Sequence, residues 1–520
     1  MFDLIIKNGR VVDGTGNAWF YGDVAISGDR IVEVGRLSTA QAKRVIDAAG
    51  LVVAPGFIDS HSHSDQPLLV DPRAESKIRQ GVTTEVIGQC GGSAAPRNSD
   101  EPVTTAAGKE LSWRTMADYL RLLDQQGVAV NVIPLIGHGN LRRMALGMAH
   151  RPATAEELER MCQLATEAMR QGAFGFTSGL IYPPSSYGDT AELVAVAKAV
   201  AAEGGIYATH MRNEGNKLME SVQEAITIGE QAGIPVHISH HKATDEANWG
   251  RVRDSLALIE AKRADGLDIT LDQYPYIASS TGLKSLVPQW AHADGVEAMR
   301  QRVLDPETGA RIRQEIIAAD RRWDCVLVSG CFVEENKQYE GKNMQEIAAL
   351  TGQEPVEALL SLLLAEDFRT RMVRFSMCEE DVEYVMRHPL VMIGSDSGAM
   401  AIDGPLFRGK PHPRSYGTFA RVLGEYVRER QILTLEEAVR KMTGLAAARF
   451  QLWDRGLLRP GCFADITVFD PQTIKDQATF VDPHQYAVGV HYVLVNGQVC
   501  VDQGERTEQL AGRPLRRTRG

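Results

Sequence analysis

Eight short apolar runs, spread along most of the chain and separated by longer segments, constrain the fold more than any other feature of this sequence. The runs favour β-strands, and most of the intervening segments carry the apolar period of an amphipathic helix. Strands that alternate with helices form a parallel sheet, and eight of them close into a barrel. We predict an α/β chain with a (β/α)8 TIM-type barrel over residues 56–449, its strands lying in the runs 51–56, 82–88, 130–136, 173–177, 206–209, 236–239, 267–272 and 391–395.

Helix signals fall between the runs. Thr154-Ala155-Glu156-Glu157 is a capping box that predicts a helix ending near Gln171, and residues 191–202 and 213–232 follow the same period. Residues 278–390, between the seventh and eighth runs, are far longer than a barrel connection needs. We expect an inserted, partly helical segment there that can cover the mouth of the barrel.

Both ends of the chain have the pattern of short strands joined by turns. Asn8-Gly9 predicts a hairpin, Gly28-Asp29 a second turn, and the runs 464–470 and 492–501 continue the pattern near the C-terminus. Isolated hairpins are only marginally stable. Residues 1–55 and 450–505 are therefore predicted to meet in one small β domain, followed by a basic tail, 506–520, that we expect to be disordered.

Composition limits the classes of binding partner and the cellular compartment that we expect for this protein. The 520 residues are 44% hydrophobic and 24% charged, and the net charge of −11 argues against a nucleic-acid partner. The apolar runs are too short for a membrane span, and the N-terminus lacks the pattern of a signal peptide. Seven scattered cysteines suit a reducing compartment. We expect a cytoplasmic protein without a membrane partner; the oligomeric state stays open.

Metal-binding residue types follow five of the predicted strands. His61 and His63 stand two residues apart, so on a strand their side chains share one face. Cysteine and histidine together are good zinc ligands, and in such barrels the chemistry lies at the carboxyl ends of the strands. The sequence therefore predicts a shared metal site built from His61, His63, Cys90, His210, His240 and Asp396.

Each of these residues also has a simpler interpretation. The two early histidines could lie in a surface loop, Cys90 could be a small buried apolar residue, and Asp396 could cap a helix. His240 and His241 would point to opposite faces of a continued strand, and periodicity does not decide which of them faces the mouth. The coincidence of all six positions with strand ends favours the metal site.

Longer motifs around these residues resemble a known family. They are His61-Ser62-His63, Gly88-Gln89-Cys90-Gly91, Thr209-His210-Met211-Arg212-Asn213-Glu214, Ile238-Ser239-His240-His241-Lys242, Asp272-Gln273-Tyr274-Pro275-Tyr276, Gly394-Ser395-Asp396 and His412-Pro413-Arg414-Ser415-Tyr416-Gly417-Thr418-Phe419. Together they are similar to the D-aminoacylase (N-acyl-D-amino-acid deacylase) family of the amidohydrolase superfamily, and the resemblance covers nearly the whole chain. It implies a (β/α)8 barrel with a small β-sandwich domain formed by both chain termini, residues 1–55 and 450–505.

The resemblance implies a zinc-dependent hydrolase of N-acyl-D-amino acids. It implies that Cys90, His210 and His240 hold one tightly bound Zn²⁺, and that His61 and His63 mark a second, often weakly filled position. Zinc lowers the pKa of bound water from about 16 to roughly 7. Asp396 would take a proton as the bound hydroxide attacks the acyl carbonyl, and would return it to the leaving amine.

Substrate contacts are also implied by the resemblance. Lys242, Tyr274 and Ser280 match positions that hold the α-carboxylate of the substrate. Arg374 departs from the aromatic residue expected there; facing the mouth it would favour an acidic substrate, and facing outward it would have no bearing on specificity.

Two other functions stay open from the sequence. One is another amidohydrolase activity on a cyclic amide or a dipeptide, as in hydantoinases, dihydroorotases and some dipeptidases. The other is a barrel that has lost catalysis and serves as an interaction scaffold, which the complete ligand set argues against.

Overall fold

The computed structural model describes residues 1–38 and 40–517 and contains the predicted barrel. Two parallel sheets, ordered β10-β7-β6 and β11-β12-β13-β14-β15-β19, share a third strand that is interrupted at Leu135. A parallel bridge between Ser62 and Ser397 closes the ring. The barrel strands are β6 (Phe57–Asp59), β7 (Val82–Ile87), β10 (Asn131–Pro134) with β11 (Ile136–Gly137), β12 (Gly175–Gly179), β13 (Ile206–His210), β14 (Val236–Ile238), β15 (Ile269–Gln273) and β19 (Val391–Ile393).

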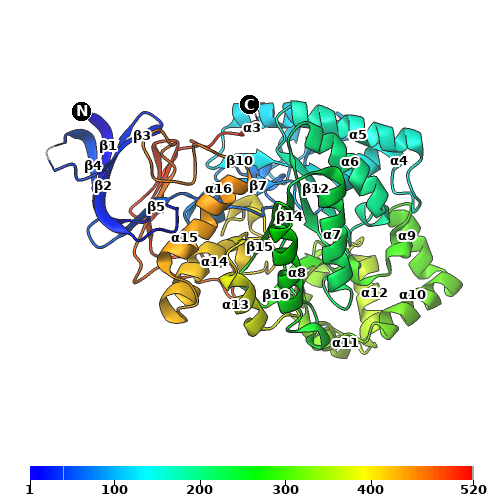
Figure 1. Ribbon diagram of the computed structural model, residues 1–520. Helices are drawn as coiled ribbons and strands as arrows, with labels where there is room; N and C mark the ends of the chain where they lie inside the picture. Colours follow the sequence, from blue (N-terminus) through cyan, green and yellow to red (C-terminus); the bar gives the residue numbers. More distant parts are fainter. Residues whose placement is uncertain (39, 518–520) are drawn as a thin grey trace.

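Helices cover the outside of the barrel (Figure 1). The capping box at Thr154 is confirmed, because its side chain accepts from the Glu157 backbone at the start of α5. α7 begins at Leu218, later than residue 213. The helices outside the inserted segment are α1 (Pro67–Val70), α2 (Glu75–Ile78), α3 (Met116–Gln126), α4 (His138–Leu146), α5 (Ala155–Arg170), α6 (Thr190–Ala202), α7 (Leu218–Ala232), α8 (Val252–Ala264), α13 (Glu379–Arg387), α14 (Arg414–Arg421) with the π-helical turn Val422–Glu429, α15 (Leu435–Met442) and α16 (Gly444–Arg449).

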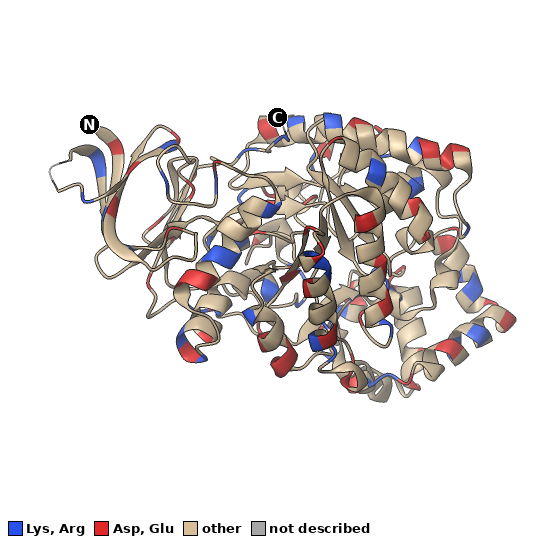
Figure 2. Cartoon of the chain, viewed as in Figure 1, with Lys and Arg blue, Asp and Glu red and all other residues tan. Residues whose placement is uncertain are grey.

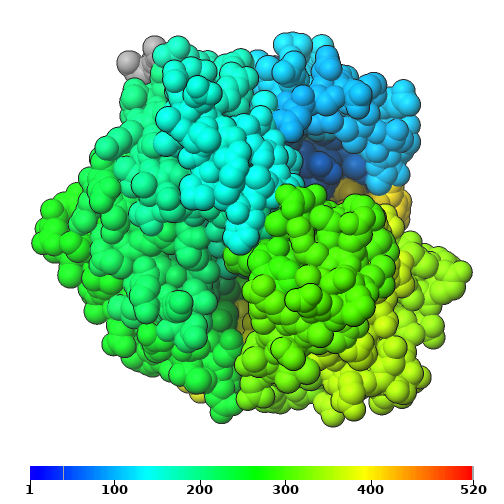
Figure 3. All heavy atoms as spheres, turned by 90° about the vertical axis from the view of Figure 1, so that its right-hand side faces the viewer, coloured from blue at the N-terminus to red at the C-terminus, as the bar shows by residue number. Residues whose placement is uncertain are grey.

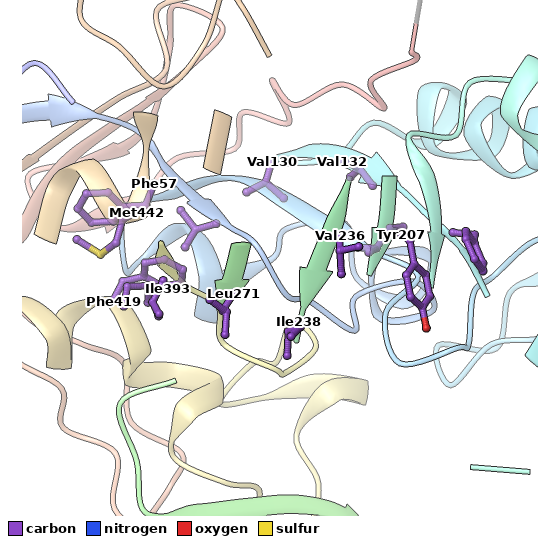
Figure 4. Packing of buried hydrophobic residues seen from close by; sticks show 14 of the residues in the cluster. Phe57, Val130, Val132, Tyr207, Val236, Ile238, Leu271, Ile393, Phe419 and Met442 are labelled. Carbon is purple, nitrogen blue, oxygen red and sulfur yellow. The ribbon is translucent and has the colours of Figure 1, made fainter. Parts of the chain in front are cut away.

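Apolar side chains from strands and helices form one large core around the barrel. Phe57 stacks on Phe419 of α14 with ring centroids 5.9 Å apart, and both rings are fully buried. Val236 and Leu271 lie on neighbouring strands of the same core (Figure 4). Burial of such side chains contributes roughly 1.5–3 kcal/mol each, which fixes the strands that carry the site residues.

Both termini meet in one hydrogen-bonded sheet, at the left of Figure 1. Asn8-Gly9 is not a hairpin turn as predicted: β1 runs through it with a bulge, and Asn8 takes φ 63°. The strands are β1 (Phe2–Val11), β2 (Phe20–Ser27), β3 (Arg30–Gly35), β4 (Ala42–Asp47), β5 (Val52–Pro55), β20 (Ile466–Phe469), β21 (Val490–Val495), β22 (Gln498–Asp502) and β23 (Glu505–Arg506).

The apolar run before His61 is two strands rather than one. β5 pairs with β20 in the terminal sheet, whereas β6 pairs with β7 in the barrel. Gly56 separates them, and a Cβ there would lie 2.2 Å from Oγ1 of Thr83. A glycine is therefore required where the chain passes from one sheet to the other.

The inserted segment has a core of its own. It is an antiparallel sheet, β16 (Ala278–Gly282), β18 (Arg371–Phe375) and β17 (Val326–Gly330), with helices α9 (Val296–Leu304), α10 (Pro306–Ala318), α11 (Met344–Thr351) and α12 (Pro355–Ala365). Their apolar residues form a separate buried cluster. The segment ends at Phe375 rather than near residue 390, because α13 packs on α8 and on two barrel strands.

The basic tail is ordered up to Arg517, so the expectation of disorder is wrong for this part. Residues 511–514 form bridges to Val128 and Val132 at the amino end of the third strand. Arg516 pairs with Asp124 on α3, and the side chain of Arg517 donates to the carbonyl of Glu203. The basic side chains thus attach the tail to the barrel.

A hairpin of β8 (Val103–Thr104) and β9 (Glu110–Leu111) completes the elements. Within the described residues, no single helix combines the length and apolarity required for a bilayer span. Only α11 and α12 together have such a composition, with an 89° bend between them.

Candidate metal centre and active site

The predicted metal ligands converge at the carboxyl ends of the barrel strands. His61 and His63 follow β6, Cys90 follows β7, His210 ends β13 and His240 follows β14. Asp396 follows β19, and its backbone N–H donates to the carbonyl of His61 across the seam of the barrel, at 2.8 Å. Side chains separated by more than 300 residues thus reach one rim.

Cys90 lies at the centre of the cluster. Its Sγ is 3.7 Å from Nδ1 of His210 and 3.5 Å from Nε2 of His240. Two ligands of a tetrahedral zinc ion, with Zn–S near 2.3 Å and Zn–N near 2.1 Å, stand about 3.6 Å apart. These three side chains therefore have the donor types and the spacing of a metal site.

A second group shares Cys90. It adds His61, His63 and Asp396, and the ligand atoms of the four residues lie within 4.8 Å of one another. Cys90 Sγ lies 3.3 Å from Nε2 of His61, and His63 Nε2 lies 3.0 Å from Oδ1 of Asp396. Cys90 therefore belongs to both groups of residues that could hold a metal ion.

His240, and not His241, faces the mouth. His241 points outward, where its Nε2 lies 2.9 Å from Oγ of Ser255 on α8. The backbone explains why periodicity did not decide this: His240 takes φ 35°, and Cys90 and Asp396 take φ 54° and 49°. These left-handed conformations cost of order 1–3 kcal/mol each in non-glycine residues, and they turn the side chains out of the strand alternation.

Asp272 supports the ligands from below. Its carboxylate lies 3.2 Å from Nδ1 of His61 and 2.7 Å from Nε2 of His237, and it accepts from the backbone N–H of His240 at 2.6 Å. Burial alone would raise the pKa of Asp272, but His61 and His237 outweigh it and hold the pKa well below its usual range. A buried carboxylate behind a histidine ligand fixes the ring orientation.

Asp396 carries the second ionised group of the rim. Arg414 at the start of α14 places Nη1 2.9 Å from its Oδ2. Burial raises the pKa of Asp396, yet Arg414 and His240 lower it well below the usual value. Burial raises the pKa of the Cys90 thiol, but His61 and His240 outweigh burial and bring this pKa well below its usual value. The site therefore holds a carboxylate and a thiolate, both ionised.

The four residues predicted to contact the substrate differ in whether they line the cavity. Ser280 on β16 lines the cavity above the metal ligands. Lys242 and Tyr274 are buried beside His240, but neither lines that cavity, and the ammonium of Lys242 lies 2.6 Å from the carboxylate of Glu214. Arg374 on β18 pairs with Asp245 and lies outside the cavity, so it does not face the mouth.

The cavity has a volume of about 680 Å³ and opens between the barrel rim and the inserted segment. Figure 3 shows the hollow on this face, bounded by light blue, cyan and green parts of the chain, with dark blue atoms at its floor. Its lining includes His63, Cys90 and Asp396. Arg414 also lines it; the sequence motif contained this residue but did not indicate its contact with Asp396.

A (β/α)8 barrel with histidines, a thiolate and a carboxylate at its carboxyl rim defines the class of metal-dependent hydrolases. The Amidohydrolase family model matches residues 44–501. D-aminoacylase of Alcaligenes xylosoxydans xylosoxydans is 40% identical over 521 residues, which cover 99% of this chain and 98% of the relative. N-acyl-D-glutamate deacylase of the same organism is 38% identical, over 99% and 96% of the two chains.

A solved structure agrees with these relatives. N-acyl-D-glutamate deacylase from Bordetella bronchiseptica, in complex with zinc and a phosphonate mimic of the tetrahedral intermediate, superposes with a TM-score of 0.84 at 34% identity, over 99% of this chain and 100% of that one. The chain therefore belongs to the amidohydrolase family and, within it, to the D-aminoacylase family.

Proposed function

We propose that the protein hydrolyses N-acyl-D-amino acids to a carboxylate and a free D-amino acid. The observation that carries the proposal is the convergence of Cys90, His210 and His240 on one point, with Asp396 beside them. The D-aminoacylase and the N-acyl-D-glutamate deacylase that cover nearly the whole chain support the substrate class.

A metal ion in this site supplies a Lewis acid that polarises the amide carbonyl and makes water more acidic. Asp396 lies at the cavity floor as a carboxylate, so it can accept the proton of the attacking water. The same carboxylate then protonates the amine nitrogen as the amide bond breaks, because an amine anion is too unstable to leave. Arg414 keeps Asp396 ionised and oriented toward the cavity.

Zinc is the proposed metal, because a thiolate with two imidazoles is a donor set that zinc prefers. Cys90, His210 and His240 would form the tighter position. His61, His63 and Asp396 would form a weaker one that shares Cys90. The bound zinc of the Bordetella relative supports the identity of the metal.

The α-carboxylate of the substrate would lie beside Arg414 and Ser280, which line the cavity, with Tyr274 buried next to Arg414. The Tyr274 hydroxyl is buried and has no hydrogen-bond partner within the described residues, and its ring lies under the guanidinium of Arg414 at 4.6 Å. A buried donor without a partner is costly unless a ligand satisfies it. Lys242 would act indirectly, by holding Glu214 and His240 in place.

A hydrolysis screen tests the proposal. Zinc-loaded protein is incubated with N-acetyl-D-amino acids of acidic, aromatic and aliphatic type, with their L enantiomers and with a cyclic imide, and released amine or acid is measured. We expect hydrolysis of D substrates only. Activity on the cyclic imide alone would indicate a hydantoinase-like function, and no activity on any compound would remove the deacylase proposal. Metal analysis of protein purified without added zinc separates an enzyme from a scaffold, because a scaffold would hold less than about one tightly bound zinc per chain.

A further inference from the structure

The cavity above the metal ligands concentrates positive charge in a chain whose net charge is −11. Four arginines line it, against two carboxylates. Arg414 is accounted for by its ion pair with Asp396. The charged residues of the lining are Asp65, Arg143, Arg371, Asp396, Arg408 and Arg414.

The other three arginines, Arg143, Arg371 and Arg408, have no ion pair and no side-chain hydrogen bond anywhere in residues 1–38 and 40–517. The second carboxylate of the lining, Asp65, does not neutralise them. Its two oxygens accept from the backbone N–H groups of Gly88 and Ala94. Three arginines therefore line this space without an ion pair to any described carboxylate.

These three arginines come from separate elements that the fold brings to one rim. Arg371 begins β18 and pairs with Gly330 of β17. Arg408 is followed by Gly409, whose backbone packs closely on Gly330. A Cβ on Gly409 would lie 3.1 Å from the Cα of Gly330. Arg143 lies on α4 and lines the same cavity.

Their environment favours a bound anion. Arg143, Arg371 and Arg408 line the cavity but remain exposed to solvent. Partial desolvation lowers the pKa of Arg371, and the neighbouring Arg408 lowers it further. Burial also lowers the pKa of Lys284, which follows β16, and Arg143 adds to that shift. Like charges held close together in a partly enclosed space repel one another, and a carboxylate that pairs with guanidinium groups in a bidentate way removes the repulsion.

We propose that Arg143, Arg371 and Arg408 form a subsite for a second carboxylate of the substrate. This proposal rests on the proposed hydrolase function. The preferred substrate is then an N-acyl-D-amino acid with two negative charges: the α-carboxylate, which Arg414 and Ser280 receive, and a distal one. The distal carboxylate can belong to the amino-acid side chain or to the acyl chain.

The cavity volume agrees with a substrate of this size. About 680 Å³ exceeds what a small acetylated amino acid fills, and it lies within the range of pockets that enclose larger ligands. A second cavity of about 350 Å³ continues past Arg143 and shares Asn140 with the first. The subsite therefore lies along the path of an extended acyl chain or side chain.

Matched substrates test the subsite. N-acetyl-D-glutamate is compared with N-acetyl-D-glutamine, and N-succinyl-D-alanine with its succinamoyl counterpart, so that each pair differs in one charge. We expect kcat/KM to be at least about tenfold higher for the dianion of one pair, as charge-assisted hydrogen bonds predict. The favoured pair identifies which end of the substrate carries the charge. Equal rates within both pairs would overturn the subsite while leaving the hydrolase proposal intact, and no hydrolysis of any N-acyl-D-amino acid would overturn both.

Arg371 and Arg374 lie on the same strand, β18, so variants of these two residues form a matched pair of test and control. Arg371→Gln and Arg408→Gln should each raise KM for the dianionic substrate about tenfold or more, with little change in kcat and none in metal content. Arg374→Gln lies three residues further along β18 but outside the cavity, so its KM should be unchanged. Equal effects of Arg371→Gln on the charged and the neutral substrate would contradict the subsite, as would equal effects of Arg371→Gln and Arg374→Gln.

Discussion

Arg414 holds Asp396 through an ion pair in which Nη1 lies 2.9 Å from Oδ2. Oδ1 of the same carboxylate lies 3.0 Å from Nε2 of His63. The two oxygens thus have different partners, one a fixed cation and the other a histidine that is a candidate metal ligand. This arrangement keeps the carboxylate ionised while leaving it at the cavity floor, where a proton must be transferred.

Replacing Asp396 should remove catalysis and leave the fold. Asp396→Asn keeps the shape but cannot take up a proton, so we expect kcat to fall by about 10²–10⁴-fold, the usual contribution of a general acid or base. Steady-state kinetics with the best substrate of the screen measures this loss. Metal bound by Cys90, His210 and His240 should stay unchanged, whereas the unfolding midpoint should fall because Arg414 loses its ion-pair partner. A folded variant with near-normal kcat would contradict the role.

Replacing Cys90 should remove both metal positions, because the thiolate belongs to both groups. After dialysis, Cys90→Ser should retain only a small fraction of the zinc that the unaltered protein retains, as elemental analysis measures. The matched control is Cys162→Ser on α5, a free cysteine outside the cavity. Full zinc retention by Cys90→Ser would exclude a shared thiolate ligand.

We expect Asp272 to strengthen zinc binding, because its carboxylate orients the side chain of His61. Asp272→Asn leaves every predicted ligand in place but weakens the contact with His61 and His237, so zinc affinity should fall by roughly 10–100-fold. Competition with a chromogenic chelator gives the affinity. An unchanged affinity would mean that the backbone alone orients His61.

Asp465 joins the terminal sheet to the barrel. Its carboxylate pairs with Arg455 and accepts from Asn131 and from the backbone of Asn496, all buried. Asp465→Ala leaves the arginine charge buried and unpaired and should lower the free energy of unfolding by about 3–5 kcal/mol. Asp454→Ala, at a half-exposed ion pair with Arg30, should cost about 1 kcal/mol or less. Urea unfolding compares the two; similar losses would contradict this difference.

Lys441 predicts a pH dependence of stability. Its ammonium is buried on α15, and burial lowers its pKa to about 8 from 10.5. The unfolded chain therefore binds more protons between about pH 8 and pH 10.5, so the unaltered protein should gain stability with rising pH in that window, relative to Lys441→Met. Urea unfolding of both proteins at several pH values measures the difference, and a constant difference across the window would contradict the shift.

Most of the architecture was predictable because barrel strands and their helices have distinct periods. The metal ligands were predictable because they follow those strands. Three features depended on contacts that no local pattern carries. The transition from β5 to β6 at Gly56 depends on Thr83, the orientation of His240 depends on a left-handed backbone, and the role of Arg414 depends on a carboxylate 18 residues earlier.

The order of the C-terminal tail and the orientation of Arg371 and Arg374 likewise depend on contacts that the local sequence does not indicate. Charge density near Arg513 indicated disorder, yet the segment pairs with the third barrel strand. From the sequence the orientation of Arg374 stayed open, whereas Arg371 is the arginine of this strand that lines the cavity. Residues three positions apart on a short strand point to opposite faces, and the sequence did not fix where that strand began.

The separate core of the inserted segment has an evolutionary consequence. Mutations inside it do not disturb the packing of the barrel that holds the metal ligands, so this module can drift or be exchanged between relatives while the catalytic floor stays constant. A chimaera that carries residues 278–375 from a relative with a different preference should therefore keep the recipient's chemistry, while its selectivity shifts only partly toward the donor's, because Arg371 is exchanged and Arg143 and Arg408 are not.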